Sequence, residues 1–203
     1  LFPFLQIFMD KGAKASLHIK TGLNGEAHPL VCNQSMIISQ EAESSLTIFD
    51  DMKMGCFSSY ISSIRATLKK GAYFEHASHI FSRERGVENI HIQLLEEKAS
   101  ASVASLIFGG KEQRNRAQVC LEHLAPNCTS SQLYKTVLKD QAKSEFEGKI
   151  YIHPAAQKTE SYQLSRALIL SEKAQATAMP NLEIFADDVQ ASHGSTVAMI
   201  DEA

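Results

Sequence analysis

The stretch Lys69-Lys70-Gly71-Ala72-Tyr73-Phe74, a charged turn followed by small residues and the start of a strand, recurs in altered form along the chain. Its relatives are Asp10-Lys11-Gly12-Ala13-Lys14-Ala15, Glu97-Lys98-Ala99-Ser100-Ala101 and Glu172-Lys173-Ala174-Gln175-Ala176. Small residues at the entrance of a strand suit a stacked solenoid, in which the chain bends tightly at every corner and neighbouring rungs lie about 4.8 Å apart. The repeat favours a right-handed parallel β-helix. Because the copies are irregularly spaced, a β-sandwich stays open as an alternative.

Short segments of alternating apolar and polar residues predict strands of three to six residues, separated by Gly-, Pro- and Asn-containing turns. They are Leu17-His18-Ile19, Ile90-His91-Ile92-Gln93-Leu94, Ile150-Tyr151-Ile152 and Leu182-Glu183-Ile184. One segment, Ser130 to Gln141, has apolar residues at helix-like spacing and predicts a single short helix, although its β-forming residues also allow a strand.

The composition indicates one domain spanning residues 1–203, since 203 residues with 44% hydrophobic content can bury a core without disulfides. The charge of -3, from 20 basic and 23 acidic residues without a cluster, argues against nucleic-acid binding.

No apolar stretch is long enough to cross a membrane, and the apolar start Leu1 to Phe8 lacks a preceding basic segment. The four cysteines, Cys32, Cys56, Cys120 and Cys128, form no CxxC pair, which fits reduced thiols in a cytoplasmic protein.

The two ends of the chain indicate a fragment of a longer protein. The sequence begins at Leu1 instead of a methionine and stops at Asp201-Glu202-Ala203 without an evident terminal element.

The sequence lacks the residue patterns of common enzyme classes, so we predict a protein without catalytic activity. Gly109-Gly110-Lys111 does not have the frame of an ATP-binding P-loop. Ser192 and His193 are adjacent and cannot form a nucleophile–base pair without a sharp turn. A β-helix enzyme acting on carbohydrates is an alternative, disfavoured because the chain has no tryptophan to stack on sugars.

Three stretches of the C-terminal half carry a resemblance to a known family. Arg116 to Leu138 (RAQVCLEHLAPNCTSSQLYKTVL) resembles a core segment of the SufB/SufD family, which assembles iron–sulfur clusters in the SUF system. Phe146 to Thr159 (FEGKIYIHPAAQKT), continued by LILS at Leu168 to Ser171, resembles a rung of that family, and Pro180 to Ile200 (PNLEIFADDVQASHGSTVAMI) resembles the signature of its SufD branch rather than SufB. The resemblance implies a parallel β-helix, which over Leu1 to Gly110 rests on the family's architecture alone.

The resemblance also implies a role as a scaffold. The chain would pair with a SufB-like subunit through the C-terminal edge of the β-helix, and a nascent iron–sulfur cluster would form there transiently, with none bound stably. The SufC ATPase would dock on a helical segment that follows the β-helix in the family and is absent from this chain. A homodimer, or a structural homologue that dimerises without contacting a cluster, are the alternatives.

The sequence departs from the family at the residue of greatest chemical interest. Where the family commonly has Cys-Ser-His-Gly, this chain has Ala191-Ser192-His193-Gly194, so a soft thiolate is lost and His193 is left as the candidate cluster or metal ligand. The alternative is a histidine bonded to a turn carbonyl. Asp187 and Asp188 are adjacent and would point to opposite faces of a strand, so we expect them to form a corner turn with an interface hydrogen bond.

The chain has other cysteines and histidines of the residue types that bind metals. Cys128, the second candidate metal ligand, follows Pro126-Asn127 on a polar turn and is expected to be more exposed and reactive than Cys120 in mid-strand, although a structural role stays open for both. The pair His76 and His79 would face opposite sides of a strand and is not expected to bind metal. His123 shares the parity of neighbouring apolar residues and is predicted to point inward.

Overall fold

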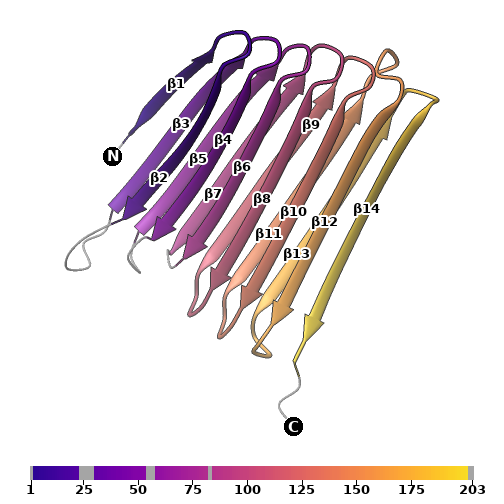
Figure 1. Cartoon of the computed structure of the whole chain (residues 1–203). Coiled ribbons are helices and arrows are strands. Elements are labelled where there is room, and N and C mark those ends of the chain that lie inside the picture. The colour runs from indigo at the N-terminus through magenta and orange to yellow at the C-terminus, as the bar shows by residue number, and fades with distance from the viewer. Residues whose placement is uncertain (1, 23–29, 54–57, 82–83, 201–203) are drawn as a thin grey trace.

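The computed structural model describes residues 2–22, 30–53, 58–81 and 84–200, which form a parallel β-solenoid (Figure 1). Two seven-stranded sheets lie face to face, and each turn of the solenoid adds one strand to each sheet. The space between the sheets, here called the lumen, is filled by side chains. The described ranges contain no helix, and hence none long and apolar enough to cross a membrane.

The odd-numbered strands make one sheet and the even-numbered strands make the other. Sheet A contains β1 (Phe4–Met9), β3 (Leu30–Gln40), β5 (Ser58–Leu68), β7 (Arg85–Leu94), β9 (Arg114–His123), β11 (Lys143–Ile152) and β13 (Gln175–Ile184). Sheet B contains β2 (Lys14–Gly22), β4 (Ser45–Lys53), β6 (Tyr73–Phe81), β8 (Ser100–Gly109), β10 (Thr129–Leu138), β12 (Thr159–Ile169) and β14 (Val189–Met199). The rungs stack from the N-terminal end to the C-terminal end, so the first and last strands lie at opposite ends of the molecule (Figure 1).

A tight turn recurs at the edge where each sheet A strand passes into sheet B. Six of these seven turns contain one residue with a positive φ, the exception being the turn between β13 and β14: Gly12 (69°), Glu43 (61°), Gly71 (63°), Lys98 (63°), Asn127 (58°) and Lys158 (59°). The N–H of this residue donates to a carbonyl of the next turn in the stack, as in Gly12 to Ala42 at 2.9 Å and Gly71 to Glu97 at 3.0 Å. The turns therefore form a hydrogen-bonded ladder of their own beside the two sheets.

The predicted β-helix is confirmed as a parallel β-solenoid, and the β-sandwich alternative is not what the chain forms. Three copies of the repeat, beginning at Asp10, Lys69 and Glu97, occupy the same edge of the solenoid, whereas the copy beginning at Glu172 occupies the opposite edge. The spacing of the copies is irregular because every rung has two corners that need the same small residues.

The strands are longer than the predicted three to six residues: all except β1 have nine to eleven. The reason is that the lumen holds buried polar side chains as well as apolar ones, which hides the alternation in the sequence. In β10, for example, Ser130, Gln132 and Thr136 are buried on the same inner face as Tyr134 and Leu138.

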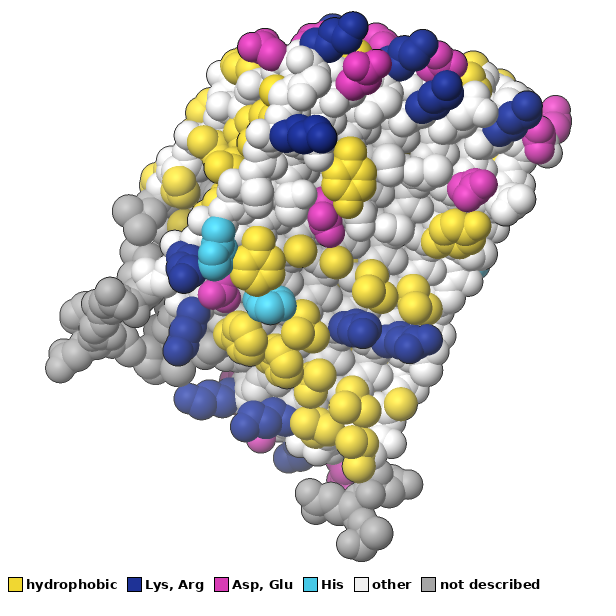
Figure 2. Space-filling model, viewed as in Figure 1, with side chains coloured by type: hydrophobic (Ala, Val, Ile, Leu, Met, Phe, Trp, Pro, Cys, Tyr) yellow, Lys and Arg dark blue, Asp and Glu magenta, His cyan; other side chains and the backbone are white. Residues whose placement is uncertain are grey.

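The predicted helix between Ser130 and Gln141 is wrong, because this segment is strand β10. Tyr134 and Leu138 point into the lumen, while Leu133 and Val137 lie on the outer face of sheet B. That outer face is itself partly apolar, with Phe81 stacked on Phe108 at 4.9 Å, and Figure 2 shows hydrophobic side chains gathered on one broad face of the solenoid. Two apolar faces on one strand imitate the spacing of a helix.

Candidate functional site at the open end

The C-terminal end of the solenoid exposes two strand edges. β13 pairs with β11 and β14 pairs with β12, and neither has a second partner within the described chain. Unpaired backbone N–H and C=O groups on such edges are ready to accept a further strand. We call these two edges, together with the inner side chains of β13 and β14, the open end.

Apolar side chains that belong to the interior are uncovered at the open end. Ile184 is in register with buried Ile152, and Met199 is in register with buried Ile169, so both point into the lumen. Nevertheless, Met199 is 49% exposed and its neighbour on the same face, Val197, is 52% exposed. Within the described residues, the last rung therefore leaves inner apolar side chains uncovered.

His193 lies on this uncovered inner face of β14. It is the register partner of Gln163, which is buried and points inward, so the imidazole also points toward the lumen and is exposed because no further described rung covers it. Ala191 is two residues earlier on the same face and is half-buried against the core. A cysteine at position 191, as in the family pattern, would thus share a face with His193.

Asp187 and Asp188 form the corner between β13 and β14 and do not gather around His193. The backbone N–H of Asp188 donates to Oε1 of Gln157 at 2.9 Å, and its carbonyl accepts from the N–H of Lys158. The backbone of the pair holds the last turn of the ladder, while both carboxylates are exposed.

The expectation that Cys128 is the more exposed cysteine is wrong. Cys128 is fully buried, its thiol donates to the carbonyl of Glu96 at 3.3 Å, and burial raises the pKa of that thiol. Cys128 precedes Gln132 by four residues, and Gln132 is two strands away from His193, which puts the two candidate ligands roughly 16 Å apart at the backbone. The structure does not bring them together.

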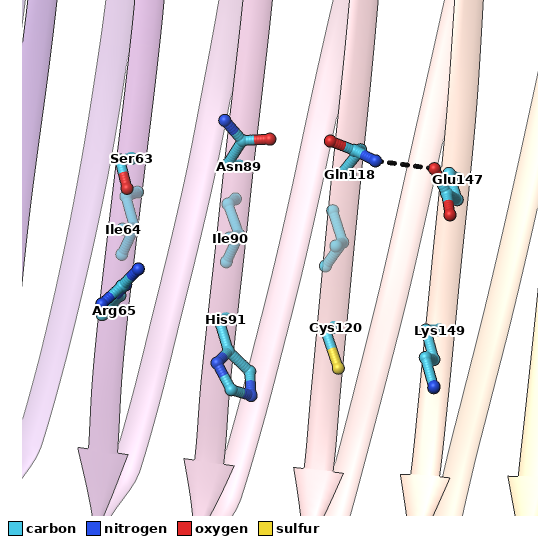
Figure 3. Close-up of a pocket in the computed structure, with 11 residues that line it drawn as sticks. Ser63, Ile64, Arg65, Asn89, Ile90, His91, Gln118, Cys120, Glu147 and Lys149 are labelled. Carbon is cyan, nitrogen blue, oxygen red and sulfur yellow. Dashed lines mark hydrogen bonds between the residues drawn. The ribbon is translucent and has the colours of Figure 1, made fainter.

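Cys120 is instead the partly exposed cysteine, on the outer face of β9. It lies in a groove of about 440 Å³ across four strands of sheet A, between His91 and Lys149 (Figure 3). Burial raises the pKa of the Cys120 thiol, and Glu122 raises it further. Lys149 is paired with Glu183 at 2.8 Å, so the positive charge beside the thiol is largely neutralised.

Polar groups around this groove connect one rung to the next. Nε2 of Gln118 donates to Oε2 of Glu147 at 2.7 Å, a bond visible in Figure 3. The carboxylate of Glu122 lies 3.2 Å from Nε2 of His91 on β7 and 2.8 Å from Nε2 of His153, which directly follows β11. Burial raises the pKa of Glu122, but the hydrogen bonds from Gln93 and the histidines lower it more. These hydrogen bonds join side chains of neighbouring rungs on a solvent-exposed face of sheet A.

His76, His79 and His123 point inward or outward as the alternation of side chains along a strand predicts. His76 is buried while His79 lies on the outer face beside Phe49, so the pair does not form a shared site. His123 is fully buried, and its Nε2 lies 2.8 Å from the hydroxyl of Ser130. Burial lowers the pKa of both His76 and His123 to about 4, which keeps them neutral near pH 7.

One residue directly beneath the open end, Gln163 of β12, could not be predicted from the sequence. Gln163 lies directly beneath His193, and this placement depends on the register between β12 and β14 across 30 residues of sequence. Gln163 is a polar residue at an inner position of β12, between Ser161 and Ser165. This pattern can be recognised in the sequence only when the length of a rung is known.

Comparisons with known proteins show the family to which the chain is similar. The model of the family described as SUF system FeS cluster assembly, SufBD core domain, matches residues 1–203. The chain is 35% identical over 114 residues to the iron–sulfur cluster assembly protein SufD of Escherichia coli, covering 56% of this chain and 27% of that protein. It is 32% identical over 115 residues to a SufBD family protein of Synechocystis, covering 56% of this chain and 25% of the relative. A SufBD family protein of Mycobacterium leprae is 27% identical over 151 residues, 70% of this chain and 38% of the relative. The matched part thus spans between a quarter and two-fifths of these relatives.

Proposed function

The chain belongs to the SufB/SufD core-domain family of the SUF iron–sulfur cluster assembly system, and we propose that it acts there as a SufD-like scaffold subunit without catalytic activity. In this role the open end pairs with a SufB-like subunit that works with the SufC ATPase, and the nascent cluster is cargo that forms at the shared interface. The signature between Pro180 and Ile200 and the similarity to the E. coli SufD protein favour the SufD side of the family.

The observation that carries the proposal is the combination of free strand edges and uncovered apolar side chains at the open end, among the described residues. Its two free strand edges offer backbone hydrogen bonds, and its uncovered side chains, such as Val197 and Met199, offer apolar area. A partner that adds a strand to each edge would form these backbone hydrogen bonds and would cover the apolar side chains. The inner and outer faces of the added strands would have to match those of β13 and β14.

In this proposal, His193 is the residue of the interface that contacts the nascent iron–sulfur cluster. A neutral imidazole can bind iron, and His193 is the exposed ligand-type side chain on the inner face of β14. Because position 191 is alanine, the thiolates for the cluster would come from the partner. Cys128 takes no part in this proposal, since it is buried and roughly 16 Å away.

A second candidate is a subunit that pairs with its partner but does not contact the cluster. The alanine at position 191 favours this reading, because a half-buried methyl group packs against the core where the family commonly has a ligand. In that case the open end is purely a docking surface, and His193 is a polar residue within it.

The test is anaerobic cluster reconstitution on the chain co-expressed with SufB-like and SufC partners, with iron, sulfide and visible absorption as readouts. His193→Ala should lower cluster content while the complex still assembles; His18→Ala, an exposed histidine of β2 at the other end of the solenoid, is the control. Unchanged loading in His193→Ala would favour the docking-only reading.

Pairing itself is tested with matched charge substitutions. Val197→Asp should abolish co-purification with the SufB-like subunit, whereas Val31→Asp should not, although the two valines are 52% and 53% exposed. If both variants co-purify normally, the open end is not the docking surface and the proposed function fails.

A further inference from the structure

Gln163 has an unusual environment for a buried amide. Its side chain is 3% exposed, and neither its oxygen nor its nitrogen finds a hydrogen-bond partner among the described residues. Buried polar groups are nearly always paired, so an amide without partners in a lumen calls for an explanation. Its location, one rung beneath His193, suggests where the partner is.

The opposite sheet is shaped to admit this side chain. A Cβ at Gly148 would lie 1.9 Å from Nε2 of Gln163 and 2.7 Å from its Cδ, so only glycine leaves room for the amide to reach across the lumen. Gly148 has no left-handed backbone conformation to explain its presence. The glycine therefore makes room both for Gln163 and for the ring of Phe146, whose Cζ would lie 2.6 Å from the added Cβ, and the amide lies against sheet A in the rung below the open end.

In the next rung, the inner side chain in register with Gln163 is His193, and the other polar side chain that flanks it on this face is Ser195, two residues further along β14. Pro180 follows Gly148 in register on sheet A, and His193 follows Gln163 on sheet B. Pro180 has no polar side-chain atom, whereas the imidazole has two nitrogens. Because His193 is exposed, its ring can turn about its side-chain bonds until one nitrogen reaches the amide.

The rung below provides an internal comparison. Gln132 is in register with Gln163 and is also buried, but its Nε2 donates to the carbonyl of Lys149 at 3.1 Å. An amide at this height can therefore bond to sheet A, and Gln163 does not. Gln132 lacks a partner for its amide oxygen alone, whereas Gln163 lacks partners for both amide atoms; the residue above Gln132 is Gln163, and the residue above Gln163 is His193.

We propose that Gln163 is the positioning residue for His193: its amide oxygen accepts the N–H of one ring nitrogen, and the other nitrogen then faces out of the open end as a lone-pair donor. A histidine that binds metal commonly donates its second N–H to an oxygen, which fixes both the tautomer and the ring orientation. This inference rests on the proposed function, in which His193 meets the cluster at the partner interface.

The first measurement is the tautomer of His193, read by nuclear magnetic resonance on the isolated chain labelled with ¹⁵N-histidine. His193→Ala assigns the signal. One tautomer should dominate in the wild type, and Gln163→Leu should shift the ratio toward that of free histidine. Gln163→Glu keeps an acceptor oxygen and should restore the dominant tautomer, and Gln132→Leu should leave the ratio unchanged.

The second measurement is cluster content of the complex with the SufB-like partner, using ferrous iron and sulfide as the probe. Loss of the positioning bond should lower the apparent affinity for iron roughly tenfold, as is typical for a ligand's supporting residue, with the loading of Gln163→Glu close to wild type.

The outcomes separate this inference from the proposed function. If His193→Ala lowers loading but Gln163→Leu changes neither loading nor tautomer, Gln163 has no positioning role and the inference is overturned. If His193→Ala leaves loading unchanged, the cluster-contact function fails, and the tautomer ratio alone decides whether Gln163 orients the ring.

Discussion

The hydroxyl of Tyr134 donates a 2.9 Å hydrogen bond to Oε2 of Glu88, a residue 46 positions earlier in the chain. The two side chains come from opposite sheets and meet in the lumen, where both are buried. Ser78 adds a second bond to the other carboxylate oxygen at 3.3 Å. A carboxylate in the interior is thus held by donors from two rungs of sheet B.

Tyr134→Phe removes a single donor from this network. The ring can still stack on Phe146, whose centroid is 4.3 Å away, so the change isolates the hydroxyl. We expect the free energy of unfolding, measured with urea, to fall by about 1–3 kcal/mol because a buried carboxylate loses a bond. Tyr73→Phe is the control, since its hydroxyl bonds Glu75 at 3.2 Å on the surface and should change stability by less than about 1 kcal/mol. Equal effects at both sites would contradict the prediction.

The buried histidines predict a loss of stability in mild acid. Burial lowers the pKa of His76 and His123 to about 4, below the value of 6.5 of an exposed histidine. Between these two pH values the unfolded chain binds protons that the folded chain excludes, so stability is complete above pH 6.5 and declines as the pH falls toward 4. Each histidine can contribute up to about 3 kcal/mol.

His76→Leu should flatten this decline, because neither ring nitrogen of His76 has a partner in the described structure and leucine fills a similar space. Urea unfolding at pH 7 and pH 5 measures the effect, and His79→Gln on the outer face serves as the control. A pH profile identical to wild type in His76→Leu would show that another group controls the decline.

Gly148→Ala is expected to destabilise the fold by about 1–3 kcal/mol through overpacking, because the new methyl group would meet Gln163 and lie 2.6 Å from Cζ of Phe146. Gly194→Ala is the comparison, since there the nearest atom is the flexible end of Leu164 at 3.3 Å. Thermal unfolding measures both. Shortening Gln163 to serine should recover part of the loss at position 148, and a failure to recover would point to Phe146 alone.

Thiol labelling distinguishes the cysteines by burial. Iodoacetamide followed by mass spectrometry should modify Cys120 in the folded protein, slowly at neutral pH because the pKa of its thiol is raised, and faster as the pH increases. Cys128 and Cys32 are buried and should react after denaturant is added. Labelling of Cys128 at the rate of Cys120 in native buffer would show that the turn opens. Cys56 lies outside the described residues.

The solenoid could be predicted from the sequence because its corners repeat a short chemical pattern, as at Lys69 and Glu97. The nature of β10 could not, because Leu133 and Val137 are apolar for the outer face and Tyr134 and Leu138 for the inner one. At the open end, His193 was found through its motif, whereas Gln163 was missed because its importance depends on pairing with a strand 30 residues away. The relative exposure of Cys120 and Cys128 could not be predicted, because a turn of polar residues can still place its cysteine in the interior, as Cys128 shows.

The ladder of turns has a consequence for how the protein opens and closes. Each rung bonds only to the rung before and the rung after it, so stability accumulates from neighbour to neighbour and is smallest where one neighbour is missing. Within the described residues, hydrogen exchange should therefore be faster in the two end rungs, β1 with β2 and β13 with β14, than in the central rungs; one of these end strands, β14, carries His193. A partner docked on that strand would turn the last rung into an internal one, so that assembly of the complex and protection of the terminal strand become one event.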